Sequence, residues 1–319
     1  MRFSNTLIFL LFTFSLMSQT FSSQDRAYVE AVQAGEQALN NEQYDECLAY
    51  YETAFKIKQT SYLSTMRAAA CAHSAGKTKI RDQYLDKAFE LSPDGSRGVF
   101  RGYDEFRYLD DSAFSKLVDE RFLAAFPDYN AELAAELAEV LRTDQEQRGY
   151  MREVSEKYGW DSPQMDSLWV LQNYSDSVNT IYITDLIDKM GYPGKSIVGD
   201  QASTAFLVIQ HAELEIQEKY LPVLRAAADA EELRWASLAL LIDRIEMRND
   251  RPQIYGSQVQ QDPETGEHFF ALIKDPHNVD KLREEVGLPP IQLYADNWNF
   301  TFDPDKHLER HANKAAAEK

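Results

Sequence analysis

The sequence predicts a mainly α-helical protein, in which repeated helical hairpins precede a larger helical domain that contains one small β-hairpin. Two similar eight-residue segments lie 34 residues apart in the first half, which indicates a repeated helical unit. Beyond residue 127 the apolar residues follow longer stretches with helical spacing. Two short β-prone runs, at residues 253–260 and 268–272, flank a turn-rich segment and predict the hairpin.

The N-terminus has the layout of a secretory signal. Arg2 precedes an apolar run at residues 7–17 and a small polar segment. The run is too short to cross a bilayer, which needs about 20 apolar residues. We therefore expect residues 1–22 to be removed near Ser22, leaving a periplasmic or secreted protein without a membrane insertion. An uncleaved anchor is the alternative.

The chain of 319 residues is strongly acidic, with a formal net charge of −19. Because Arg2 is the only charge in residues 1–22, the mature chain carries −20. No basic stripe with interleaved aromatic residues offsets this charge, so the sequence predicts no nucleic-acid partner and disfavours anionic membrane surfaces.

Only two cysteines are present, Cys47 and Cys71, which excludes the disulfide framework of small secreted domains. Their default interpretation is core packing, since a free cysteine behaves as a small apolar group. A disulfide between neighbouring helices is the alternative in an oxidising compartment.

The repeated segments occupy residues 50–57 and 84–91, and their spacing is typical of tetratricopeptide repeats, which they resemble. Ala54 and Ala88 allow close helix packing, and four aromatic residues are expected to fill the space between hairpins: Tyr50, Phe55, Tyr84 and Phe89. We expect the repeat region to span residues 25–126, with Pro93 ending its fourth helix and a degenerate third pair at 102–126. Such repeats usually bind peptides or partner proteins; packing against the second domain is the alternative.

The second domain is expected at residues 130–295, followed by an extension at 296–319 whose residues 305–319 form a solvated tail. Its predicted helices are 131–158, 163–173, 177–190, 201–228 with a kink or break at Pro222, 231–248 and 278–286. Residues 192–200 are expected to form a loop after a helix stop at Gly191.

Polar residues interrupt the apolar faces of three of these helices. Leu137, Leu141, Asp144, Arg148 and Met151 follow one helical stripe, and Gln145 lies beside it. An acid and a base thus occupy a face that is expected to be buried.

The same pattern recurs twice. Gln210 and His211 follow the apolar run 205–209, and Asp243 and Arg244 follow the apolar run 238–242. Unpaired buried polar groups are costly, so we expect these residues to converge and satisfy one another or to face a cleft.

Convergence predicts roles for these residues. Asp144 or Asp243 would orient His211 as a general base, and Arg148 and Arg244 would hold a carboxylate or phosphate. The remaining predicted ligand-binding residues are Gln145, Gln210, Tyr255 and Gln258. Gly256, inside the first predicted strand, indicates a bulge or a close backbone approach. A structural network without a ligand is the alternative.

The order of short motifs in the second half resembles a bacterial domain of unknown function that often follows tetratricopeptide repeats in exported proteins. The motifs are Asp144-Gln145 with Arg148, Gly191-Tyr192-Pro193, Val198-Gly199, Gln210-His211-Ala212, Asp243-Arg244, Tyr255-Gly256-Ser257-Gln258 and Val286-Gly287-Leu288. The resemblance implies that these polar positions form a shared site, and it implies no particular activity.

We predict no cofactor and no metal site. His307 and His311 are four residues apart, but no third ligand accompanies them. Two functions are therefore compatible with the sequence. The first is an exported protein that binds a partner through its repeats and a small polar or anionic ligand in the second domain. The alternative is an enzyme, such as a hydrolase, with His211 as general base.

Overall fold

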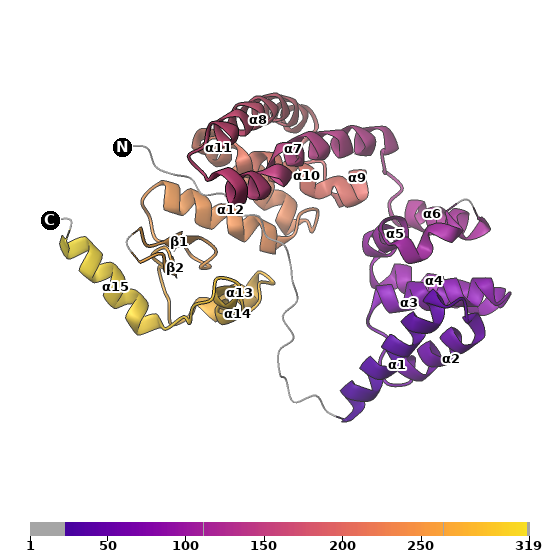
Figure 1. The fold of residues 1–319 in the computed structure, drawn as a ribbon. Helices are drawn as coiled ribbons and strands as arrows, with labels where there is room; N and C mark the ends of the chain where they lie inside the picture. Colours follow the sequence, from indigo (N-terminus) through magenta and orange to yellow (C-terminus); the bar gives the residue numbers. More distant parts are fainter. Residues whose placement is uncertain (1–22, 111, 264, 318–319) are drawn as a thin grey trace. The chain divides into compact units, whose positions relative to one another are not determined.

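The computed structural model describes residues 23–110, 112–263 and 265–317 and divides into two compact units, Met1–Phe122 and Leu123–Lys319 (Figure 1). The fold is mainly α-helical with one small antiparallel β-hairpin, as predicted. The predicted signal at residues 1–22 lies outside the described residues. No helix in the described ranges is long and apolar enough to cross a membrane.

Unit 1 consists of consecutive antiparallel helices. They are α1 (Ser23–Asn40), α2 (Tyr44–Phe55), α3 (Tyr62–Ser74), α4 (Thr78–Leu91), α5 (Pro93–Gly102), the 3-10 helix η1 (Asp104–Leu109) and α6 (Ala113–Ala125), which continues into unit 2. Helices α1 and α2 form one hairpin and α3 and α4 the next. Pro93 begins α5 directly after α4 ends, because the Ser92 hydroxyl accepts a hydrogen bond from the Gly95 N–H.

The small residues of the repeated segments lie in the core of unit 1, since Ala54 and Ala88 are fully buried. One aromatic residue was predicted wrongly. Tyr50 is 42% exposed, and its neighbour Tyr51 is buried instead, where its ring stacks on Phe55. A shift of one residue turns a helical side chain by about 100°, which is enough to exchange the core for solvent.

Cys47 and Cys71 form a disulfide between α2 and α3, with their Cα atoms 6.2 Å apart. Core packing as free thiols, the default interpretation of the sequence, is therefore wrong. Both residues are also fully buried, so the cross-link lies inside the packed hairpins.

Unit 2 begins with two long antiparallel helices, α7 (Ala131–Tyr158) and α8 (Pro163–Met190). Helix α7 has the predicted bounds. Helix α8 is continuous, whereas the sequence predicted a break between Asn173 and Ser177. The helix tolerates these polar residues because the Ser177 hydroxyl donates to the Asn173 carbonyl and Asp176 pairs with Arg148.

The central helices of unit 2 are α9 (Lys195–Val198), the 3-10 helix η2 (Gly199–Gln201), α10 (Ala202–His211), α11 (Leu214–Asp229) and α12 (Trp235–Arg248). Residues 192–200 are thus partly helical rather than a loop. The single helix predicted for 201–228 breaks after His211, whereas Pro222 lies inside α11. The Gln217 side chain donates to the Gln210 carbonyl and satisfies the free end of α10.

The hairpin pairs β1 (Val259–Gln261) with β2 (His268–Phe270) in antiparallel register, with Val259 opposite Phe270. Helices α13 (Val279–Glu285), α14 (Ile291–Asp296) and α15 (Pro304–Ala317) complete the unit. The predicted solvated tail at 305–319 is wrong for the described part, because α15 packs on the hairpin. The buried His307 ring accepts a hydrogen bond from the Ile273 N–H through Nε2.

Candidate functional site

Asp144 and His211 meet where α7 packs against the last residue of α10. His211 Nδ1 lies 3.0 Å from Asp144 Oδ1, and Arg148 Nη1 lies 3.3 Å from the same oxygen. The Asp144 and Arg148 side chains are 1% and 4% exposed, whereas His211 is 11% exposed. The predicted stripe of α7 therefore faces inward, and the imidazole is the part of this trio that reaches solvent most.

The carboxyl group of Asp144 is held ionised by its neighbours. Burial by itself raises its pKa, but the hydrogen bond with His211 and the charges of His211 and Arg148 together hold the pKa below its usual value. Gln145 contributes by donating from Nε2 to Asp144 Oδ2 at 2.6 Å. Within the described residues no hydrogen bond engages His211 Nε2, so this nitrogen is free to contact a ligand.

Two residues of α8 that the sequence analysis missed complete the ionic network. Arg148 Nη2 donates to Asp176 Oδ2 at 2.8 Å, and Gln172 donates to both Asp176 Oδ1 and the Asp144 carbonyl. Gln172 and Asp176 are four residues apart on one helical face, which is the pattern that revealed Asp144 and Arg148. The wrongly predicted break in α8 separated these two residues and concealed the pattern.

The donor set does not fit a metal ion. Asp144, Asp176 and His211 each offer one ligand atom within 4.8 Å of the others. The guanidinium of Arg148, however, already contacts both carboxylates and would repel a divalent cation placed between them. The cluster is better described as an ionic network around one arginine.

Two further arginines lie at the C-terminal end of α10. Arg244 and Arg248 are one turn apart on α12, and they donate to the main-chain carbonyls of Gln210 and Ala212, each at 3.0 Å. Burial, together with the neighbouring charge of Arg248, lowers the pKa of Arg244 to about 10. Neither guanidinium forms an ion pair with an acid among the described residues.

Asp243 has a different role from the one predicted, because it does not contact His211. Its carboxylate accepts hydrogen bonds from the N–H groups of Ile254, Tyr255 and Ser257, and it is fully buried. Burial raises the pKa of Asp243, and these three hydrogen bonds oppose that shift. Asp243 thus shapes the loop that follows α12. The first predicted strand, residues 253–260, bends at residues 254–257 instead of pairing there.

The loop after α12 is also held by a buried arginine that the sequence analysis missed. Arg283 donates to the carbonyls of Tyr255 and Pro289. Gly256 adopts a φ of +67°, and a Cβ there would lie 2.6 Å from the side chain of Ile291. The close backbone approach predicted at Gly256 is therefore present.

The remaining predicted residues lie around this loop or contribute through their main chain. Gln258 donates to the Ser257 hydroxyl, and Tyr255 contributes its N–H and carbonyl. Gln210 provides the carbonyl that Arg244 contacts. The structure thus brings Asp144, Gln145, Arg148 and His211 together with the Gln210 main chain and Arg244. It places Asp243, Tyr255 and Gln258 in and around the loop that follows α12.

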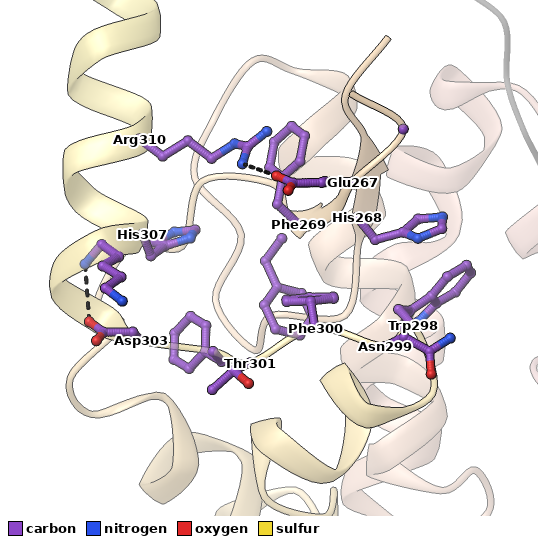
Figure 2. Close-up of a pocket in the computed structure, with 14 residues that line it drawn as sticks. Glu267, His268, Phe269, Trp298, Asn299, Phe300, Thr301, Asp303, His307 and Arg310 are labelled. Atoms are coloured by element: carbon purple, nitrogen blue, oxygen red, sulfur yellow. Dashed lines mark hydrogen bonds and ion pairs between the residues drawn. The ribbon is translucent and has the colours of Figure 1, made fainter. Parts of the chain in front are cut away.

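A cavity of about 530 Å³ lies elsewhere in unit 2, between the hairpin, residues 298–303 and α15 (Figure 2). None of the predicted site residues lines it. Aromatic side chains dominate its wall. Two of its charged groups already have partners, because Arg310 pairs with Asp262 and Glu267 and Asp303 caps α15. The cavity is thus separate from the network around Asp144 and His211.

The fold and the site together define a mainly helical domain built around a buried His–Asp–Arg network. The chain belongs to the DUF6624 family, a family of unknown function whose model matches residues 128–301. This match contains α7, α8, α10 and α12, and hence the whole network. No curated protein and no solved structure matches the chain.

Proposed function

We propose that this protein is an exported ligand-binding protein whose second unit recognises a small anionic group at the C-terminal end of α10. The observation that carries the proposal is the pair Arg244 and Arg248, which have no acidic partner among the described residues although the chain has a net charge of −19. Guanidinium groups bind carboxylate and phosphate with several donors at once. His211 lies in the chain between Gln210 and Ala212, whose carbonyls the two arginines contact, and its Nε2 has no hydrogen-bond partner among the described residues.

The charge balance around α10 supports an anion rather than a cation as the ligand. Arg148 is neutralised by Asp144 and Asp176, so these acids are not available to Arg244. Each guanidinium of the Arg244–Arg248 pair makes one hydrogen bond among the described residues and has further N–H donors to offer. An anion that accepts these donors would also relieve the mutual repulsion of the two cations.

The disulfide supports export, because disulfides persist mainly in oxidising compartments outside the cytosol. The helical hairpins of unit 1 support the assignment to tetratricopeptide-type repeats, whose usual role is to bind a peptide or protein partner. In this proposal unit 1 binds a partner and unit 2 binds the small ligand.

Calorimetric titration of the chain from residue 23 with inorganic phosphate and with acetate tests the ligand site. The unchanged protein is expected to bind one of these anions at a single site, and Arg244→Met is expected to weaken binding by at least about tenfold. Arg251→Met is the matched control, because Arg251 is exposed near the same end of α12 and already pairs with Glu246. Equal binding by all three proteins, or no binding of either anion, contradicts the proposal.

Arg244→Met is expected to leave the fold intact, which makes the titration interpretable. Removing a partly buried cation recovers its desolvation cost and offsets the loss of one hydrogen bond to a carbonyl. Far-UV circular dichroism of the variant, compared with the unchanged protein, checks this point.

A second candidate function is general-base catalysis, and the hydrogen bond between Asp144 and His211 favours it. A carboxylate on one ring nitrogen fixes the imidazole and leaves the other nitrogen to accept a proton. A panel of chromogenic ester and phosphate substrates tests this candidate. His211→Ala is expected to lower any activity by about 100-fold or more, while Arg251→Met leaves it unchanged; an activity that survives His211→Ala rules the candidate out.

A further inference from the structure

Helix α8 exposes large apolar side chains to solvent along its outer face. Tyr174 is 72% exposed, Val170 69% and Ile181 65%, and Leu171 and Val178 extend the same surface. Figure 1 shows α8 along the outside of unit 2, beside α7. A contiguous apolar patch on a soluble protein often marks a contact surface.

The spacing of these residues is that of a helix-pairing seam. Leu171, Tyr174, Val178 and Ile181 follow one another in steps of three, four and three residues, which is the a and d pattern of a coiled coil. We call these four residues the α8 seam. The opposite face of α8 packs inside unit 2 through Met165, Ile183 and Ile187, together with the polar Gln172 and Asn179, so the inner face is already occupied. The α8 seam is therefore a second, apolar stripe, and such a stripe normally packs against another element.

The charge distribution of α8 fits a second copy of this chain. Two molecules of net charge −19 repel each other unless the contact surface is uncharged. Residues 167–184 contain one charged residue, Asp176, and its carboxylate is bound to Arg148 within the same molecule. The α8 seam is thus an uncharged strip on a strongly acidic protein.

The seam is also complementary to itself. When two copies of α8 pair antiparallel about residue 176, Leu171 of one copy faces Ile181 of the other, and Tyr174 faces Val178. The first contact joins two apolar side chains of similar size, and the second joins a large side chain to a smaller one. A twofold dimer requires this property, because the same patch must serve both partners.

We propose that the protein forms a twofold homodimer through antiparallel pairing of the α8 seam. The contact is independent of the proposed anion site. The exposed seam, together with Val170, offers on the order of 600 Å² of apolar side-chain surface per copy. That area corresponds to the small end of specific interfaces, so the dimer dissociates on dilution.

Sedimentation equilibrium of the chain from residue 23 tests the proposal. Between about 1 and about 200 µM, the range in which a small interface is expected to assemble, the mass should rise twofold. Tyr174→Glu should remain monomeric throughout with unchanged circular dichroism, and Ile181→Glu provides a second variant if the first misfolds. Tyr103→Glu, an equally drastic change at an exposed tyrosine of unit 1, should dimerise like the unchanged protein.

Cysteine cross-linking tests the register. The double variant Leu171→Cys with Ile181→Cys should give a covalent dimer under mild oxidation, while each single variant should not, because each cysteine then faces an apolar residue of the second copy. The native cysteines do not interfere, since they are already paired. A chain that stays monomeric up to the highest concentration, or a dimer that Tyr174→Glu and Ile181→Glu leave intact, overturns the proposal. A monomer in which another segment of the same chain covers the α8 seam also overturns the proposal.

Discussion

At the residue scale, Asp144 and His211 are joined by one hydrogen bond but are expected to differ in their importance for stability. Asp144→Ala leaves the buried Arg148 with Asp176 as its remaining acid, and breaking such a buried pair costs about 3–5 kcal/mol. His211→Ala removes one hydrogen bond and leaves Asp144 bound to Arg148 and Gln145, which costs about 2 kcal/mol.

Urea unfolding of the two variants measures this difference. If His211→Ala is as destabilising as Asp144→Ala, the imidazole is a structural member of the network, and its role in binding loses its main support. A smaller loss for His211→Ala agrees with a residue that the fold tolerates for the sake of a ligand.

His307 provides a pH-dependent contribution to stability. Burial, helped by the nearby His311, lowers the pKa of His307 to about 4. Because the unfolded chain binds the proton more readily, this contribution is complete above about pH 6.5 and is lost as the pH falls toward 4. Protonation would also remove the acceptor that Nε2 offers to the Ile273 N–H.

The difference in unfolding free energy between pH 7 and pH 5 is therefore expected to shrink in His307→Gln. The glutamine side-chain oxygen accepts the same hydrogen bond at both pH values. An unchanged pH dependence in this variant would show that α15 is held by other contacts.

Residue patterns predicted the buried half of the site better than its surroundings. Asp144 and Arg148 were identifiable because they interrupt an apolar stripe of α7, and both are buried. Asp243 interrupts α12 in the same way, yet its carboxylate turns to the N–H groups of residues 254–257. Periodicity reveals that a polar residue is buried, but its partner depends on which loop folds over it.

At the element scale, the disulfide is expected to stabilise unit 1. Cys47 and Cys71 are 24 residues apart, and closing a loop of that length contributes about 3 kcal/mol. Cys47→Ser with Cys71→Ser should therefore lower the unfolding transition of unit 1.

The two units can be followed separately, because all four tryptophans lie beyond residue 122, at positions 160, 169, 235 and 298. In the variant without the disulfide, the unfolding transition seen by tryptophan fluorescence reports on unit 2 and should stay at the same denaturant concentration. Circular dichroism, which reports on both units, should show a larger loss of helix at lower denaturant than in the unchanged protein. If the circular-dichroism transition of the variant coincides with that of the unchanged protein, the disulfide contributes little to the stability of unit 1.

Helix boundaries show where local propensity was overruled by tertiary contacts. The polar residues between Asn173 and Ser177 favour caps and turns, and they predicted a break in the helix. Helix α8 nevertheless continues, because the Ser177 hydroxyl bonds to the Asn173 carbonyl and Asp176 pairs with Arg148. Pro222 predicted the break in the next helix, whereas the chain turns after His211. There the Gln210 carbonyl accepts hydrogen bonds from Gln217 and Arg244, and the Ala212 carbonyl accepts one from Arg248. Both errors occur beside the candidate site.

At the scale of the whole molecule, net charge connects the two proposals. An acidic chain attracts few anions unless a cluster of cations overcomes its field locally, and it self-associates only where its surface is uncharged. Arg244 and Arg248 meet the first condition, and the outer face of α8 meets the second. Added salt is therefore expected to weaken anion binding and to strengthen dimerisation by screening the repulsion between copies.

The central claim, that His211, Arg244 and Arg248 serve one anion, is tested most directly by nitrogen-detected NMR of their side chains during a phosphate titration. The guanidinium signals of Arg244 and Arg248 and the Nε2 signal of His211 are expected to shift together, with one dissociation constant, while the signal of Arg251 stays in place. Shifts no larger than that of Arg251, or different dissociation constants for the three side chains, would contradict the claim.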